Sequence, residues 1–292
     1  MMRVMMDRRH RTARVVQAQT DCQRRLLLGV VILAALSAVL APACGSSGPG
    51  TRAGRAQVRV AAAADLDAAL GDLIARFSAT HAVDVSASYG SSGTFFAQIL
   101  NGAPFDIFLS ADVEYPRQLA ERGLTLAGGN FEYAVGRLVL WTPPATGPGM
   151  QGGEVTSLGS LTGDAVKHVS IANPEHAPYG RAAVAALRTA GVYDAVKPKL
   201  VYGENVAQAL QFAQSGSADA AIVAMSLALS PNLEGGGRWV EVPADSYPRL
   251  EQGGAILRGV KDVEAAMALR AFLTGSDGRA VLQRFGFGLP EH

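Results

Sequence analysis

The residues best suited to chemistry lie in short loops, each between a strand-like run and a helix-like run. The clearest loop is Gly90-Ser91-Ser92-Gly93-Thr94, where two hydroxyl groups lie between glycines that allow close approach to the backbone. A helix that begins directly after such a loop adds unpaired N–H groups and the positive end of its dipole. The loop therefore predicts anion binding with Ser92 as a donor, and simple capping of the next helix by Ser92 is the alternative.

Three further joints have the same place in the pattern, and each offers a neutral donor or a backbone N–H group. The first is Ala64-Asp65, the second is the loop 173–180 with Tyr179 near its end, and the third leads into a helix at Val206. A carboxylate repels an anion, so either the Asp65 N–H is the contact or the ligand carries a proton; helix capping by Asp65 is the alternative. Tyr179 offers a hydroxyl, and Val206 offers its backbone N–H.

The sequence lacks the residue patterns that metal binding, nucleotide binding and serine hydrolysis require. No His, Cys, Asp and Glu cluster has metal-ligand spacing, and neither a Walker loop nor a Rossmann fingerprint is present. His176 stands alone and is more simply structural than a ligand. The serine loop lacks the Gly-x-Ser-x-Gly spacing of hydrolases. A net charge of +1 argues against nucleic acid. We therefore expect a binding protein with no catalytic residue, no cofactor and no direct cation site; a secreted serine hydrolase using Ser92 and a scaffold or adhesion module are remote alternatives.

The elements that position these loops alternate between strand and helix along the chain. Strand patterns are followed by apolar residues at helical spacing, as in 57–61 and then 66–77. This alternation predicts parallel sheets flanked by helices, in two α/β lobes with a ligand cleft between them. We expect residues 57–136 and 227–292 to form the first lobe and residues 137–226 the second. Ligands of open α/β sheets bind beyond the carboxyl ends of the strands, where all four joints lie.

The first 56 residues have the features of an export segment. Arg24-Arg25 precede an apolar run from Leu26 to Leu40, and Ala41-Pro42-Ala43-Cys44 follows. This pattern predicts a signal peptide over residues 1–43 and a flexible Gly/Ser-rich tether over 44–56. Lipidation of Cys44 is the favoured outcome, and ordinary cleavage near Ala43 is the alternative. A membrane helix is disfavoured because the apolar run is shorter than the ~20 residues that a span needs.

Several blocks of the mature chain together resemble one family, the molybdate-binding periplasmic proteins of ABC importers. The resemblance covers essentially the whole mature chain in order, and its most specific parts are the Gly-Ala-Pro-x-Asp-x-Phe-x-Ser-Ala-Asp and Pro-Glu-His blocks. The matching segments are 58–66, Val83-Asp84-Val85, 89–94, 102–112, Asn173-Pro174-Glu175-His176 and Phe285-Gly286-Phe287.

The resemblance implies a two-lobed type II periplasmic binding protein that closes on molybdate or tungstate and delivers it to a permease in the cytoplasmic membrane. Carried over by position, the residues that hold the oxyanion are Ala64, Asp65, Ser92, Tyr179 and Val206. Molybdenum is then bound only as the oxyanion, by a monomer that lies in the periplasm or is anchored to the outer face of the membrane.

Two positions depart from the pattern of that family. The first loop usually offers Ser, Thr or Asn, whereas Ala64 and Asp65 stand here, and Ala224 replaces a tyrosine that binds in some members. Tyr179 is the expected substitute donor. A phosphate- or sulfate-type receptor remains the alternative, because Asp65 is able to accept a proton from monohydrogen phosphate.

Overall fold

The computed structural model describes residues 55–144, 155–231, 233 and 236–291. The predicted signal peptide, Cys44 and almost all of the predicted tether lie outside the described residues. Within the described part of the chain, no helix is long and apolar enough to cross a membrane.

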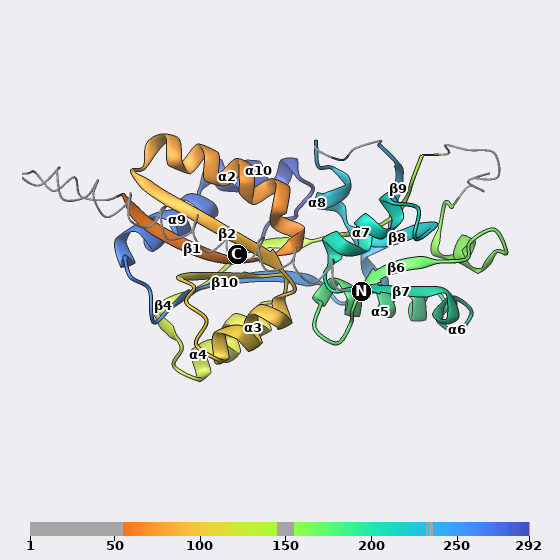
Figure 1. Cartoon of the computed structure of the whole chain (residues 1–292), viewed down its shortest axis with the longest axis horizontal. Helices are drawn as coiled ribbons and strands as arrows, with labels where there is room; N and C mark the ends of the chain where they lie inside the picture. Colours follow the sequence, from red (N-terminus) through yellow and green to blue (C-terminus); the bar gives the residue numbers. More distant parts are fainter. Residues whose placement is uncertain (1–54, 145–154, 232, 234–235, 292) are drawn as a thin grey trace, which may run out of the picture. The chain divides into compact units, whose positions relative to one another are not determined.

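The first sheet has the strand order β2-β1-β3-β10-β4 (Figure 1). Strand β1 pairs in parallel with both β2 and β3, whereas β10 runs antiparallel to its neighbours β3 and β4. The strands are β1 (Ala56–Ala63), β2 (Val83–Gly90), β3 (Ile107–Ser110), β4 (Thr125–Gly136) and β10 (Leu250–Leu257).

Helices cover both faces of this sheet because its central strands are apolar on both sides. In β3, Ile107 and Leu109 join the core beneath α2, α9 and α10, whereas Phe108 between them packs with α3 and α4. Alternate side chains of one strand thus point to opposite faces of the sheet, and Figure 1 shows the two groups of helices on opposite sides of it. The elements are η1 (Ala64–Leu66), α2 (Asp67–Thr80), α3 (Ser92–Leu100), α4 (Glu114–Glu121), α9 (Val263–Thr274) and α10 (Ser276–Arg284).

The second sheet has the order β7-β6-β8-β5-β9. Strand β6 is parallel to β7 and β8, and β5 is antiparallel to β8 and β9. Its strands are β5 (Leu138–Thr142), β6 (Val169–Ala172), β7 (Leu200–Gly203), β8 (Ala220–Ala224) and β9 (Arg238–Glu241). The remaining elements are α5 (Pro178–Thr189), α6 (Tyr193–Val196), α7 (Val206–Gln214), α8 (Met225–Ala228), η2 (Leu158–Thr162), η3 (Lys197–Lys199) and η4 (Ala244–Ser246).

The chain passes between the two sheets twice. It first crosses at Arg137, the single residue between β4 and β5, and it returns between β9 and β10. The return lies later than the sequence division predicts, since that division assigns everything from residue 227 to the first lobe. Strand β9 belongs to the second sheet because it pairs with β5, with Glu241 opposite Val139. Residues 238–241 are therefore part of the second lobe.

Candidate functional site

The five residues predicted to bind a ligand line one narrow cavity. They come from four separate joints, and they meet because all four joints follow the carboxyl ends of strands. The cavity is lined by Ala63, Ala64, Asp65, Gly90, Ser91, Ser92, Ala111, Ala177, Pro178, Tyr179, Asn205 and Val206. None of these lining residues is a lysine or an arginine, so hydrogen bonds are the means by which they can hold an anion.

Helix starts supply the backbone donors around this cavity. The residues that precede η1, α3 and α5 form no side-chain capping bond. At α7 the Asn205 carboxamide accepts the N–H groups of Ala207 and Gln208, both at 3.0 Å. Val206 is the first residue of the helix, and its N–H is not one of the two groups that Asn205 caps. The first N–H groups of a helix have no partner within the helix, so Val206 presents one donor at the cavity.

The two serines of the glycine-flanked loop have different roles, and neither caps a helix through its side chain. The Ser91 hydroxyl donates to the backbone carbonyl of His176 at 2.5 Å, which commits its only hydrogen. Ser92 is the first residue of α3, and its Oγ accepts the N–H of Ala111 at 3.0 Å. That bond leaves the Ser92 hydrogen available, so Ser92 is the serine equipped to donate to an anion.

Asp65 lies inside η1 and is almost completely buried, with 1% of its surface exposed. Its Oδ2 accepts the hydroxyl of Tyr179 at 2.9 Å and also the side-chain amide of Gln252. Its Oδ1 has no hydrogen-bond partner among the described residues. Burial raises the pKa of the Asp65 carboxyl to about 6, against the opposing effect of the bonds from Gln252 and Tyr179. Asp65 is thus a structural centre of the cavity wall and does not cap a helix.

Tyr179 and Gln252 bring the second lobe and strand β10 into this wall. The Gln252 amide also donates to the Tyr179 oxygen at 3.2 Å. Burial raises the pKa of Tyr179 well above its usual value, so this residue keeps its phenolic hydrogen. The Ser226 hydroxyl donates to the backbone oxygen of Asp65 at 2.7 Å and holds η1 against α8. Sequence reasoning did not identify Gln252 or Ser226, because no local pattern marks either of them.

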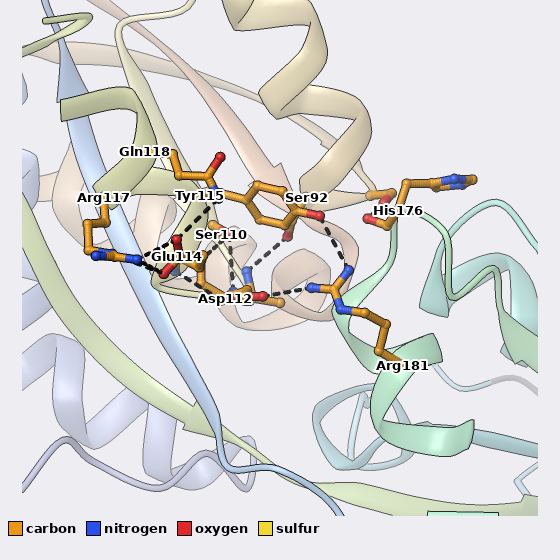
Figure 2. Close-up of polar contacts among 11 residues, drawn as sticks. Ser92, Ser110, Asp112, Glu114, Tyr115, Arg117, Gln118, His176 and Arg181 are labelled. Atoms are coloured by element: carbon orange, nitrogen blue, oxygen red, sulfur yellow. Dashed lines mark hydrogen bonds and ion pairs between the residues drawn. The ribbon is translucent and has the colours of Figure 1, made fainter. Parts of the chain in front are cut away.

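Further polar contacts join the two lobes beside the cavity (Figure 2). The Arg181 guanidinium on α5 donates to the Asp112 carboxylate at 2.7 Å and to the Tyr115 hydroxyl at 3.3 Å. The Gly93 N–H donates to the His176 carbonyl at 2.9 Å, which is the same carbonyl that Ser91 reaches. Arg181 and Asp112 stayed outside the predicted site, although Asp112 ends one of the most specific blocks.

A larger depression of about 900 Å³ lies between α2, α7 and the end of α10. Its lining includes the carboxylates of Asp67 and Asp72, and Arg284 in the same lining is paired with Asp72. Two carboxylates against one paired guanidinium disfavour an oxyanion. The narrow cavity is therefore the better anion site despite its smaller size.

Two α/β lobes linked by two crossings, with neutral donors around a cavity between them, define a two-lobed solute-binding protein. Residues 58–288 match the family described as bacterial extracellular solute-binding protein, and the chain belongs to this family. The predicted fold class and the resemblance noted in the sequence are both confirmed.

Relatives with assigned names are similar over most of the chain. The molybdate-binding protein ModA of Azotobacter vinelandii is 42% identical over 236 residues, which cover 80% of this chain and 90% of that protein. The ModA of Rhodobacter capsulatus is 35% identical over 231 residues, which cover 79% and 88% of the two chains. The solved structure of the Azotobacter vinelandii periplasmic molybdate-binding protein superposes with a TM-score of 0.70 at 32% identity, over 80% of this chain and 100% of that chain.

The fold extends to receptors with other ligands. The sulfate-binding protein SubI of Mycobacterium tuberculosis superposes with a TM-score of 0.66 at 16% identity, over 80% of this chain and 86% of that chain. This likeness concerns the fold alone.

Proposed function

We propose that this protein captures molybdate outside the cytoplasm and delivers it to an ABC importer. The observation that carries the proposal is the cavity in which Ala64, Asp65, Ser92, Tyr179 and Val206 meet, without a lysine or arginine in its lining. The ModA names of its relatives support molybdate as the ligand. Tungstate has the same charge and shape, so it is a second ligand of the same site.

The donors available at the cavity are sufficient for tight binding. They are the Ser92 hydroxyl, the N–H groups at the starts of η1 and α3 other than that of Gly93, and the Val206 N–H. A hydrogen bond to a charged group contributes roughly 1.5–3 kcal/mol. Five to seven such bonds give about 8–21 kcal/mol before the cost of ordering the complex, compared with the ~8 kcal/mol of micromolar affinity.

The Asp65 carboxylate argues against a phosphate receptor. A phosphate receptor uses such a group to accept the proton of monohydrogen phosphate, whereas Asp65 Oδ2 already accepts from Tyr179 and Gln252. Its other oxygen is buried, and burial disfavours the ionised carboxylate that an accepting role needs. Molybdate offers no proton and makes no such demand.

The proposed location follows from the export segment. Residues 1–43 act as a signal peptide, Cys44 carries a lipid, and residues 44–56 tether the binding unit to the outer face of the cytoplasmic membrane. There the protein meets its permease as a monomer. Mass spectrometry of the mature N-terminus distinguishes a lipidated Cys44 from cleavage near Ala43.

Titration calorimetry on the exported, processed protein tests the ligand assignment. Molybdate and tungstate should bind with sub-micromolar affinity, and sulfate at least a hundredfold more weakly, because the smaller sulfate ion cannot reach donors on both walls at once. Sulfate or phosphate binding as tightly as molybdate would overturn the proposal.

A further inference from the structure

The donor count at Tyr179 conflicts with a direct bond from this residue to a bound anion. A tyrosine hydroxyl carries one hydrogen, and in this structure that hydrogen is directed to Asp65 Oδ2 at 2.9 Å. The two amide hydrogens of Gln252 are both used, one on Asp65 Oδ2 and one on the Tyr179 oxygen. While Asp65 is ionised, Tyr179 therefore has nothing to donate to an anion in the cavity.

One added proton reverses the direction of that bond. When Asp65 Oδ2 carries a hydrogen, it donates to the Tyr179 oxygen, and the Tyr179 hydrogen is then free to turn toward the cavity. The Gln252 amide keeps both of its acceptors throughout. In this step one proton moves from a hydronium ion of the solvent to the Asp65 carboxylate. One O–H bond of the hydronium ion breaks and one O–H bond forms on Asp65.

We propose that anion capture takes up a proton at Asp65, and that this proton frees the Tyr179 hydroxyl to donate to the bound anion. The inference rests on the proposed oxyanion-binding function. It makes Asp65 a positioning residue that acts through Tyr179, and it explains how a carboxylic acid can stand in the wall of an anion site.

The surroundings of Asp65 favour the neutral acid once an anion is present. Among the described residues no positively charged side chain stabilises the ionised form of Asp65, and burial raises the pKa of its carboxyl to about 6 against the opposing bonds from Gln252 and Tyr179. A dianion in the same cavity raises it further, because like charges at short distance disfavour the ionised form. Arg181 cannot compensate, since it is paired with Asp112.

The described elements that surround Asp65 contribute no other buried carboxylate. Four tyrosines lie on these elements or next to them, and burial raises the pKa of each. They are Tyr179 on α5, Tyr133 on β4, Tyr89 on β2 and Tyr247 directly after η4. The carboxylates on these and the adjoining elements are Asp67 and Asp72 on α2, Asp84 on β2, Glu132 on β4 and Glu251 on β10, and none of them is buried. Helix α7 carries no titratable side chain, and α8 offers the neutral Ser226. His176 lies in the loop before α5, outside the residues that line the cavity, and is the control for any proton taken up elsewhere.

Calorimetry in buffers of different ionisation enthalpy measures the proton uptake directly. With molybdate at pH 7.5 the wild-type protein should take up close to one proton per anion. Its affinity should weaken by close to tenfold for each pH unit between 7 and 8.5, because one proton is linked to binding.

Two variants locate the proton. In Asp65→Asn position 65 cannot ionise, and its amide NH2 can donate to the Tyr179 oxygen once Gln252 turns its own amide oxygen toward that NH2. Proton uptake should therefore vanish, and the affinity at pH 8 should equal or exceed that of wild type. His176→Gln should retain the uptake. The wild-type measurement needs no variant, so the proposal stays testable even if Asp65→Asn folds poorly.

The outcomes separate this inference from the proposed function. Molybdate binding without proton uptake overturns the inference and leaves the molybdate assignment intact. Uptake that persists in Asp65→Asn, or that disappears in His176→Gln, also overturns it. Absence of molybdate binding at every pH between 6 and 8.5 overturns both.

Discussion

Replacement of Gly93 by alanine tests whether contact between the lobes contributes to ligand affinity. A Cβ atom added at Gly93 would lie 2.6 Å from the His176 carbonyl oxygen and 2.9 Å from both Cα and Cβ of His176. These distances are shorter than real contacts, and the opposing atoms are mainly backbone, so the two lobes must separate slightly. The residue lines neither wall of the cavity, so the substitution leaves the ligand donors in place.

The size of the effect follows from the bonds that share the His176 carbonyl. The Gly93 N–H and the Ser91 hydroxyl both donate to it, at 2.9 Å and 2.5 Å. Each such bond contributes about 0.5–1.5 kcal/mol, so loss of both costs about 1–3 kcal/mol of closure energy. Molybdate affinity should fall roughly 5- to 150-fold in titration calorimetry. The unfolding temperature without ligand should not fall, because the three nearest atoms to the added methyl all belong to the other lobe.

Gly71 provides the matched control. It lies in the interior of α2, and an added Cβ there meets no atom within 4 Å. Gly71→Ala should stabilise the protein by about 1 kcal/mol through helix propensity and leave affinity unchanged. Equal affinities for wild type and Gly93→Ala would refute the role assigned to the contact between Gly93 and His176.

Four further substitutions probe the site and its surroundings. Ser92→Ala should weaken molybdate binding by about 10- to 150-fold, since it removes a donor to a charged ligand worth roughly 1.5–3 kcal/mol. Ser91→Ala should weaken it by about tenfold or less, because the Ser91 hydroxyl bonds a backbone carbonyl and not the ligand. Similar losses in the two variants would contradict the different roles assigned to the two serines. Arg181→Met should weaken binding by at most about fivefold, because a half-exposed ion pair contributes about 0.2–1 kcal/mol, and the difference from wild type should shrink in high salt. Without ligand, Asp65→Asn should become more stable than wild type as the pH rises from 4 to 6. The folded pKa of about 6 lies above the unfolded value of 3.8, so wild type loses about 3 kcal/mol across that window and nothing more above it, as urea unfolding at several pH values would show.

The sequence allowed the cavity to be predicted because its parts are local. Each strand-to-helix joint carries its own signature, and parallel pairing then brings the joints to the same edge, as with Ser92 after β2 and Asp65 after β1. Gln252 could not be found in this way. It lies 187 residues further along the chain than Asp65, and its side chain meets the Asp65 carboxylate because of its register opposite Ala134, next to a bulge.

Strand β4 is the main element that the sequence did not indicate. Its segment Gly128-Gly129-Asn130 has the composition of a turn, and the backbone bends there: Gly128 has a φ of 67°, and the register against β10 shifts between Ala255 and Leu257. Pairing with β10 continues on both sides of this irregularity, with Asn130 opposite Ala255 and Thr125 opposite Leu257. Long-range pairing also explains the misplaced lobe boundary. Strand β9 belongs to the second lobe because it pairs with β5, about a hundred residues earlier, and the residues of β9 themselves do not indicate this partner.

The order of strands in the first sheet has a consequence for how the chain folds as it is made. Strand β10 lies between β3 and β4, so β4 has no neighbour in its sheet until residues 250–257 have been synthesised. The second sheet, by contrast, is complete once Glu241 has emerged. The lobe that begins first therefore finishes last, and a chain that stops before Leu250 would leave both β3 and β4 with unpaired edges.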